Sequence, residues 1–163
     1  AHRFFAPHVG GSNYPTDATE EPLIELTSPL QQRMQDTLAH FSAEPGMRIV
    51  VAEGLSAGVL IQLFHQGLLP PPDAFIVVSP YLPQWQLNQE LAKSLAALPF
   101  PVLDLQAANA NNWSSSTTKN RAIQAKRAHH FHYRQRTMPR SPILEQVLTK
   151  HIYGWLKHEG LQG

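Results

Sequence analysis

The chain contains no cysteine, so disulfide bonds and thiolate metal sites are excluded. This composition is compatible with both the cytosol and the periplasm, because neither compartment requires cysteine. No apolar run approaches the roughly 18 residues of a membrane-spanning helix, and we therefore expect no membrane span. Charged residues make up only 15% of the chain and nearly cancel to a net charge of +1. Such a balance argues against strong global steering of a nucleic acid.

Acidic residues are missing from one long stretch, because no Asp or Glu occurs from Leu105 through Leu144. Seven of the 13 basic residues fall in it: Lys119, Arg121, Lys126, Arg127, Arg134, Arg136 and Arg140. The stretch is interpreted as a solvated basic face. The alternative is an anion-binding surface over residues 119–140, with Arg134, Arg136 and Arg140 as candidate ligands of the anion. Aromatic residues are too sparse here for a binder of single-stranded nucleic acid.

The pattern of apolar residues predicts strands that alternate with helices. Strands are expected at 48–52, 74–78, 101–105 and 131–136, and helices at 28–41, 59–67, 85–98, 117–128 and 142–158. This alternation indicates the α/β class, with a mostly parallel sheet of about four strands and helices on both faces, in a three-layer sandwich. We expect residues 1–22 to form an irregular arm and residues 23–163 to form a single domain.

The most informative motif is Gly54-Leu55-Ser56-Ala57-Gly58, a G-x-S-x-G sequence between an apolar strand and an apolar helix. A nucleophile elbow has this context, because its serine lies on a strained turn from strand to helix. Ser56 is then the candidate nucleophile, the backbone N–H of Ala57 a candidate oxyanion donor, and Gly54 and Gly58 the small residues of the turn. The alternative is a turn that is kept for folding.

With these elements, residues 23–160 resemble the C-terminal half of an α/β-hydrolase. The stretches 72–78, 98–105 and 133–136 are also similar to an uncharacterised bacterial family of unknown function with that fold, whose members are typically exported. The resemblance implies a periplasmic or otherwise exported protein and no cofactor. It also implies that the first half of a hydrolase is missing, and the chain begins at Ala1 without a methionine, as a fragment or processed product would. We expect residues 1–22, a second copy or the missing half to cover the exposed edge of the sheet.

The partners of a catalytic serine are not found where the resemblance places them. The acid belongs after the strand at 101–105, where the sequence has Asn109, Asn111 and Asn112, or after the strand at 74–78, where it has Ser79. The histidine belongs at 137–141, and no histidine occurs there. His65 and His151 each lie about nine residues along a helix, or ~13 Å at ~1.5 Å per residue. We therefore expect no imidazole nitrogen within hydrogen-bonding reach of the Ser56 hydroxyl.

Three further features have both a plain and a functional interpretation. His129, His130 and His132 lie close together, but no carboxylate or cysteine nearby in sequence completes a metal site, so no metal is expected. We expect His130, His132, Arg134 and Arg136 on the outer face of the fourth strand, opposite an inner Phe131 and Tyr133. Asp104 is expected to be a buried carboxylate that accepts backbone N–H groups. Residues 8–11, His-Val-Gly-Gly, are similar to a lipase oxyanion loop, but no predicted strand precedes them.

Three functional hypotheses follow from these observations. The first is a non-catalytic or vestigial α/β-hydrolase-like domain with a binding or scaffold role, alone, as a homo-oligomer or paired with a missing half. The second is a serine ester or amide hydrolase that uses Ser56. The third is an anion-binding module that uses the basic surface at 119–140.

Overall fold

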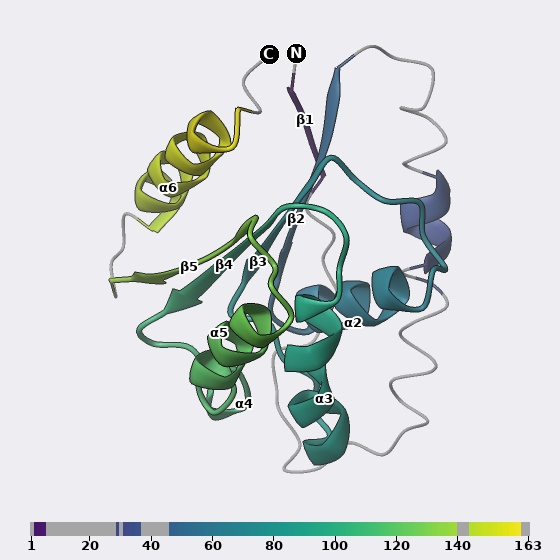
Figure 1. Cartoon of the computed structure of the whole chain (residues 1–163), viewed down its shortest axis with the longest axis vertical. Coiled ribbons are helices and arrows are strands. Elements are labelled where there is room, and N and C mark those ends of the chain that lie inside the picture. Colours follow the sequence, from purple (N-terminus) through teal and green to yellow (C-terminus); the bar gives the residue numbers. More distant parts are fainter. Residues whose placement is uncertain (1, 6–28, 30, 37–45, 140–143, 161–163) are drawn as a thin grey trace.

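The computed structural model describes residues 2–5, 29, 31–36, 46–139 and 144–160, with the backbone alone for 2–5 and 144–149. Its centre is a five-stranded sheet in which every neighbouring pair is parallel and the strand order is the chain order (Figure 1). The strands are β1 (His2–Phe5), β2 (Met47–Glu53), β3 (Ala74–Val78), β4 (Val102–Ala107) and β5 (Tyr133–Met138). The predicted α/β class with a parallel sheet is therefore confirmed.

Helices cover the sheet on both sides (Figure 1). They are α2 (Gly54–His65), α3 (Trp85–Ala96), α4 (Asn112–Ser115), α5 (Thr118–Arg127) and α6 (Leu144–His158). We call the side covered by α2, α3 and α5 the α5 face, and the side covered by α6 the α6 face. Each face has its own buried apolar cluster, and the cluster on the α5 face is the larger one. No helix in the described part of the chain combines the length and the apolarity needed to cross a bilayer.

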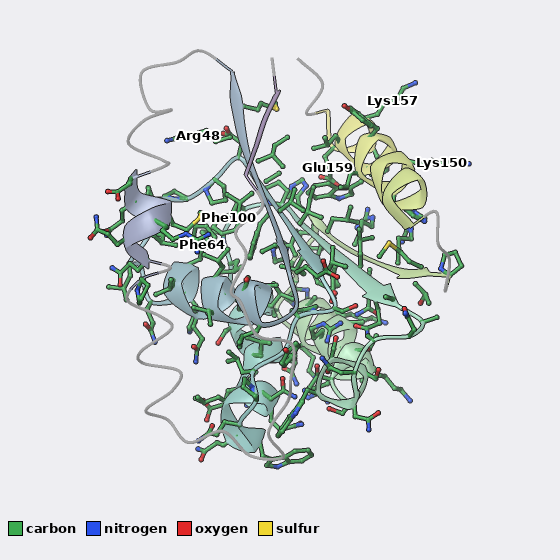
Figure 2. The ribbon with its side chains drawn as sticks, turned by 180° about the vertical axis from the view of Figure 1, so that it is seen from behind. Arg48, Phe64, Phe100, Lys150, Lys157 and Glu159 are labelled. Carbon is green, nitrogen blue, oxygen red and sulfur yellow. The ribbon has the colours of Figure 1, made fainter. Side chains whose placement is uncertain are left out.

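Alternation along the central strand explains why its sequence is apolar throughout. Phe75 and Val77 belong to the cluster on the α5 face, whereas Ile76 and Val78 belong to the cluster on the α6 face. All five residues of β3 are buried, because both faces of a parallel sheet are covered by helices. On the α5 face, Phe75 packs edge-on against Phe64 of α2, with ring centroids 5.1 Å apart. Phe64 also packs against Phe100 (Figure 2).

The first strand lies in the segment that was expected to be irregular. Residues 2–5 form β1, which pairs in parallel with β2 so that His2 lies opposite Met47. The N-terminal residues thus cover the edge of β2, which is one of the covers expected from the sequence. The premise that no strand precedes residues 8–11 is wrong, and those residues themselves lie outside the described part of the chain. Four residues without alternation are too short a pattern to reveal a strand.

The last strand begins later than the sequence suggested. Phe131 precedes β5 and is 75% exposed, so the expected inner position of this residue is wrong. Tyr133 is buried on the α5 face, as expected. The chain reaches β5 through a backbone turn at His129, where φ is +55°. Arg134 and Arg136 alternate with Tyr133 and therefore belong to the opposite face, where α6 lies over them.

Candidate functional site

The turn between β2 and α2 is made by Gly54 and not by Ser56. Gly54 is the first residue of α2 and has a φ of +60°, a conformation that side chains disfavour. Ser56 is the third residue of the helix and is buried. In the described part of the chain, the non-glycine residues with positive φ are Ser79 and His129. The backbone strain expected at Ser56 is therefore absent, and the turn falls two residues earlier than in a nucleophile elbow.

The two glycines of the motif have packing roles. A Cβ atom built on Gly58 would lie 2.0 Å from the carbonyl oxygen of Tyr81, so only glycine fits this approach. The N–H of Tyr81 lies 3.4 Å from the carbonyl oxygen of Gly54, to which it donates. In a regular helix that begins at Gly54, the N–H of Ala57 donates to the carbonyl of Glu53. The two glycines of the motif therefore allow the start of α2 to pack directly against the loop after β3.

The two positions where a hydrolase carries its acid are occupied by structural residues. Asn111 caps the short helix α4 and accepts a hydrogen bond from the N–H of Ser114 at 2.9 Å. Ser79, at the end of β3, accepts a hydrogen bond from the N–H of Ala107 with its hydroxyl at 3.0 Å. This bond ties the carboxyl ends of β3 and β4 together. Neither position offers a carboxylate.

Asp104 is the centre of a buried polar network on the α5 face. Its carboxylate accepts hydrogen bonds from Nε and Nη2 of Arg121 at 2.7 and 3.2 Å, from the Tyr133 hydroxyl, and from Nε2 of Gln135 at 3.1 Å. Both members of the ion pair are fully buried. Arg121 also donates to Gln106 at 2.7 Å. Burial raises the pKa of Tyr133 above its ordinary value, and the adjacent Asp104 charge raises it further.

This network corrects two expectations from the sequence. Asp104 is a satisfied buried carboxylate, but its hydrogen-bond donors are side chains and not backbone N–H groups. Arg121 was counted in the basic surface, yet it is fully buried and its charge is neutralised. The helical spacing of Arg121 and Ala125 was the signal that could have predicted the burial of Arg121, because residues four apart lie on the same stripe of a helix.

The described histidine side chains lie at three other places. His65 is exposed at the end of α2, and His151 and His158 line a cavity under α6. His129, His130 and His132 precede β5, and Nδ1 of His132 lies 2.7 Å from the Glu159 carboxylate. In the described ranges, no group of histidine and acidic side chains is arranged to hold a metal ion. The predicted separation of every imidazole from the Ser56 hydroxyl stays a prediction.

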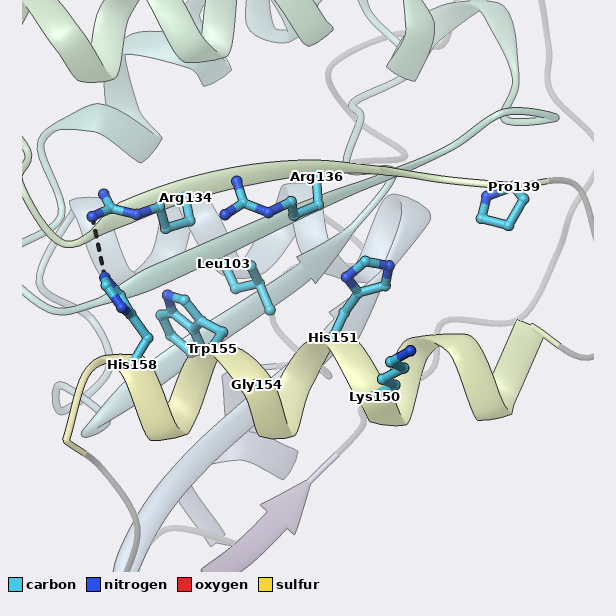
Figure 3. Close-up of a pocket in the computed structure, with 9 residues that line it drawn as sticks. All are labelled: Leu103, Arg134, Arg136, Pro139, Lys150, His151, Gly154, Trp155 and His158. Atoms are coloured by element: carbon cyan, nitrogen blue, oxygen red, sulfur yellow. Dashed lines mark hydrogen bonds between the residues drawn. The ribbon is translucent and has the colours of Figure 1, made fainter.

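A cavity lies between β5 and α6 (Figure 3). We call it the basic pocket. Its volume is about 700 Å³, and the residues that line it are Leu103, Arg134, Arg136, Pro139, Lys150, His151, Gly154, Trp155 and His158. Three of them carry a permanent positive charge, and none is acidic.

Strand register and helix periodicity together build the basic pocket. Arg134 pairs with Leu103 of β4, so the two side chains lie next to each other on the α6 face, and Arg136 follows two residues later. On α6, residues 150, 151, 154, 155 and 158 recur at helical spacing and form one stripe. His151, Trp155 and His158 extend from this stripe toward β5, where the two arginines lie opposite them (Figure 3).

Two of the three anion-binding candidates from the sequence, Arg134 and Arg136, are brought together in this pocket. Arg140 lies outside the described residues. Sequence reasoning missed the contribution of α6, namely Lys150, His151, Trp155 and His158. The basic spacing along 150–158, interrupted by a glycine, was the signal that could have revealed it.

A family model describes this chain. A model of a protein family of unknown function, DUF3530, matches residues 12–158, and the chain belongs to that family. No curated protein matches the chain, and no solved structure matches it either.

Proposed function

We propose that this chain is a non-catalytic α/β-hydrolase-like domain that acts by binding, and that the Gly54–Gly58 motif is retained for packing. The observation that carries this proposal is the position of the turn. Positive φ falls on Gly54, while Ser56 is buried within the first turn of α2. A catalytic serine in this fold needs to be the strained residue itself, with its hydroxyl exposed above the sheet.

The use made of Asp104 supports the same conclusion. Its negative charge is neutralised by Arg121, and it also accepts hydrogen bonds from Tyr133 and Gln135. A triad acid instead accepts a hydrogen bond from the catalytic histidine and orients its ring. Asp104 is the only carboxylate on β4, the strand after which a hydrolase carries its acid. Catalysis by Ser56 would thus need an acid from elsewhere.

A fluorophosphonate probe tests this proposal directly, because it labels activated serine nucleophiles. We expect no labelling of the purified protein under conditions in which a serine esterase is labelled to completion. Ser56→Ala is expected to fold normally and to leave any background hydrolysis of p-nitrophenyl acetate unchanged. Rapid labelling that disappears in Ser56→Ala would overturn the proposal and support the alternative, a serine ester or amide hydrolase.

An exported location is part of the same proposal, since the similar bacterial family is typically exported. Fractionation of bacterial cells that express the natural full-length protein is the measurement. We expect the protein in the periplasmic fraction together with a periplasmic marker enzyme. Recovery with a cytosolic marker would contradict this part of the proposal and leave the binding role untouched.

A further inference from the structure

We propose that the basic pocket binds the oxyanion of a small organic molecule, a phosphate monoester or a carboxylate, whose apolar body lies against Leu103 and Trp155. This inference deepens the proposed function, because it names a site and a ligand class for the binding role. It rests on the charges, the unpaired polar groups and the shape of the pocket between β5 and α6.

Positive charge is concentrated here without compensation. Arg134, Arg136 and Lys150 line one cavity, and none of them forms an ion pair with a carboxylate in the described part of the chain. The two arginines donate hydrogen bonds to backbone carbonyl oxygens. Arg134 donates to Tyr133 at 2.9 Å, and Arg136 donates to Gln135 at 2.9 Å. A net charge of only +1 for the whole chain makes this local excess conspicuous. Bound oxyanions supply the missing partner, and guanidinium groups match them geometrically.

Arg134 also contacts a second basic side chain of the pocket, that of His158. Nη2 of Arg134 lies 3.5 Å from Nε2 of His158 (Figure 3). Arginine has no acceptor atom, so in a hydrogen bond between these two side chains Nε2 of His158 has to be the acceptor. An oxyanion placed between the two side chains would accept a hydrogen bond from each of them, and the imidazole would then carry its proton on Nε2.

The remaining wall of the pocket is apolar and includes one unpaired donor. The indole ring of Trp155 is buried, and its Nε1–H has no hydrogen-bond partner among the described residues. That nitrogen lies on the edge of the ring that faces β5 (Figure 3). The volume of about 700 Å³ lies within the roughly 300–1,000 Å³ typical of small-molecule sites. A pocket of this limited volume, bounded by one strand and one helix, suits a small molecule better than a polymer, which needs an extended basic track.

Gly154 shows that α6 leaves room for a ligand. A glycine inside a helix lowers helix stability relative to alanine, and no turn or close contact requires one at this position. A Cβ atom built on Gly154 would have no heavy atom within 4 Å. The missing side chain therefore leaves open space at the pocket wall, between His151 and Trp155 on the same stripe.

Titration with 2-naphthyl phosphate tests the proposal, with binding measured by calorimetry and by ¹H–¹⁵N spectra of the indole N–H groups. The chain has three tryptophans, and Trp155→Phe identifies the signal of the one in the pocket. We expect binding that shifts the Trp155 signal and leaves those of Trp85 and Trp113 in place. Neutral 2-naphthol and inorganic phosphate are each expected to bind at least about tenfold more weakly, because each lacks half of the recognised groups. Titration with 2-naphthoate shows whether phosphate or carboxylate is preferred.

Two variants and one control locate the site. Arg136→Gln is expected to weaken binding of 2-naphthyl phosphate about tenfold by removing a charge-assisted hydrogen bond. Gly154→Leu fills the open space and is expected to abolish binding without changing any charge. Arg127→Gln, an exposed arginine on α5, removes the same charge on the other face and should bind like the natural chain.

Three results would overturn the proposal: no binding of either naphthyl anion at millimolar concentration, equal weakening by Arg127→Gln and Arg136→Gln, or binding that Gly154→Leu leaves intact. Labelling of Ser56 by a fluorophosphonate is a separate readout on the other side of the sheet. Failure of the non-catalytic proposal is therefore distinguishable from failure of this one.

Discussion

The two faces of the sheet differ in how their charged side chains are paired, although β5 contributes residues to both faces. On the α5 face, Asp104 and Arg121 are fully buried and neutralise each other within a satisfied network. On the α6 face, Arg134 and Arg136 lie over a cavity with no carboxylate partner among the described residues. Alternate residues of a single strand thus serve a closed structural network and an open basic pocket.

The difference separates charges that stabilise from charges that are available for binding. A buried ion pair is strongly destabilised when one partner is lost, because an unpaired buried charge remains. Removal of a partly solvated basic group changes the free energy of unfolding only slightly, because water already screens its charge. Stability measurements should therefore be sensitive on the α5 face, and ligand binding should be sensitive on the α6 face.

The largest effect is expected from Asp104→Ala. It leaves Arg121 buried without its partner and should lower the free energy of unfolding by about 3–5 kcal/mol. Urea denaturation measures this change. Arg136→Ala, on the same sheet but the other face, is the control and should stay within about 0.5 kcal/mol of the natural chain.

A double variant sharpens this test. Asp104→Leu combined with Arg121→Leu removes both charges and should recover most of the loss, because apolar residues can replace a buried pair. A loss in Asp104→Ala no greater than in Arg136→Ala would show that the two faces do not differ in this way.

The next largest effect is expected from Gly58→Ala on the α5 face. The new methyl group would meet the Tyr81 carbonyl oxygen at 2.0 Å, so α2 or the loop after β3 has to move. Overpacking of this kind costs roughly 1–3 kcal/mol. Thermal unfolding followed by circular dichroism is the measurement. An unchanged midpoint would mean that the motif is not kept for packing.

The opposite sign is expected for Gly154→Ala on the α6 face. Its methyl group enters open space, and alanine favours the helix, so stability should rise by about 0.5–1 kcal/mol. Thermal unfolding of Gly154→Ala and Gly58→Ala under the same conditions isolates the effect of the surroundings, since the chemical change is identical. A destabilised Gly154→Ala would contradict the open space assigned to the pocket.

The smallest effect concerns pH and His130. Burial lowers the pKa of His130 below its usual value, while backbone hydrogen bonds oppose the shift. The unfolded state then binds more protons than the folded state once the pH falls below about 6.5, so stability decreases as the pH is lowered through this value. Urea midpoints between pH 7.5 and 5.5 should show this loss, and His130→Phe should reduce it. A pH dependence that His130→Phe leaves unchanged would contradict this assignment.

The sequence was sufficient for the parts of the fold that depend on local pattern. Continuous apolar runs predicted β2 and β3, because a strand covered on both faces has no polar alternation. β1 was missed because a strand of four residues has too little pattern to identify. The basic candidates Arg134 and Arg136 were found because the surrounding 40 or so residues lack acids.

Contacts between distant segments explain what the sequence did not reveal. Asp104 and Arg121 are 17 residues apart, and composition alone counts Arg121 as a surface charge. The basic pocket needs α6 to lie across β5, and nothing local to residues 150–158 specifies that packing. The position of the turn at Gly54 was also beyond sequence reasoning, because a G-x-S-x-G motif does not state which residue takes the positive φ.

The strands have the same order in the sheet as in the chain, and this order affects how the molecule folds. Register pairs Ile49 with Ala74 and Phe75 with Val102, so these crossovers close short segments of chain. Joining β1 to β2 pairs His2 with Met47 and closes the longest segment in the sheet. Loop-closure entropy grows with segment length, and β1 has only four residues with which to offset it. Among these five strands, β1 is therefore expected to dock last, and its amide protons to exchange with solvent before those of β2–β4.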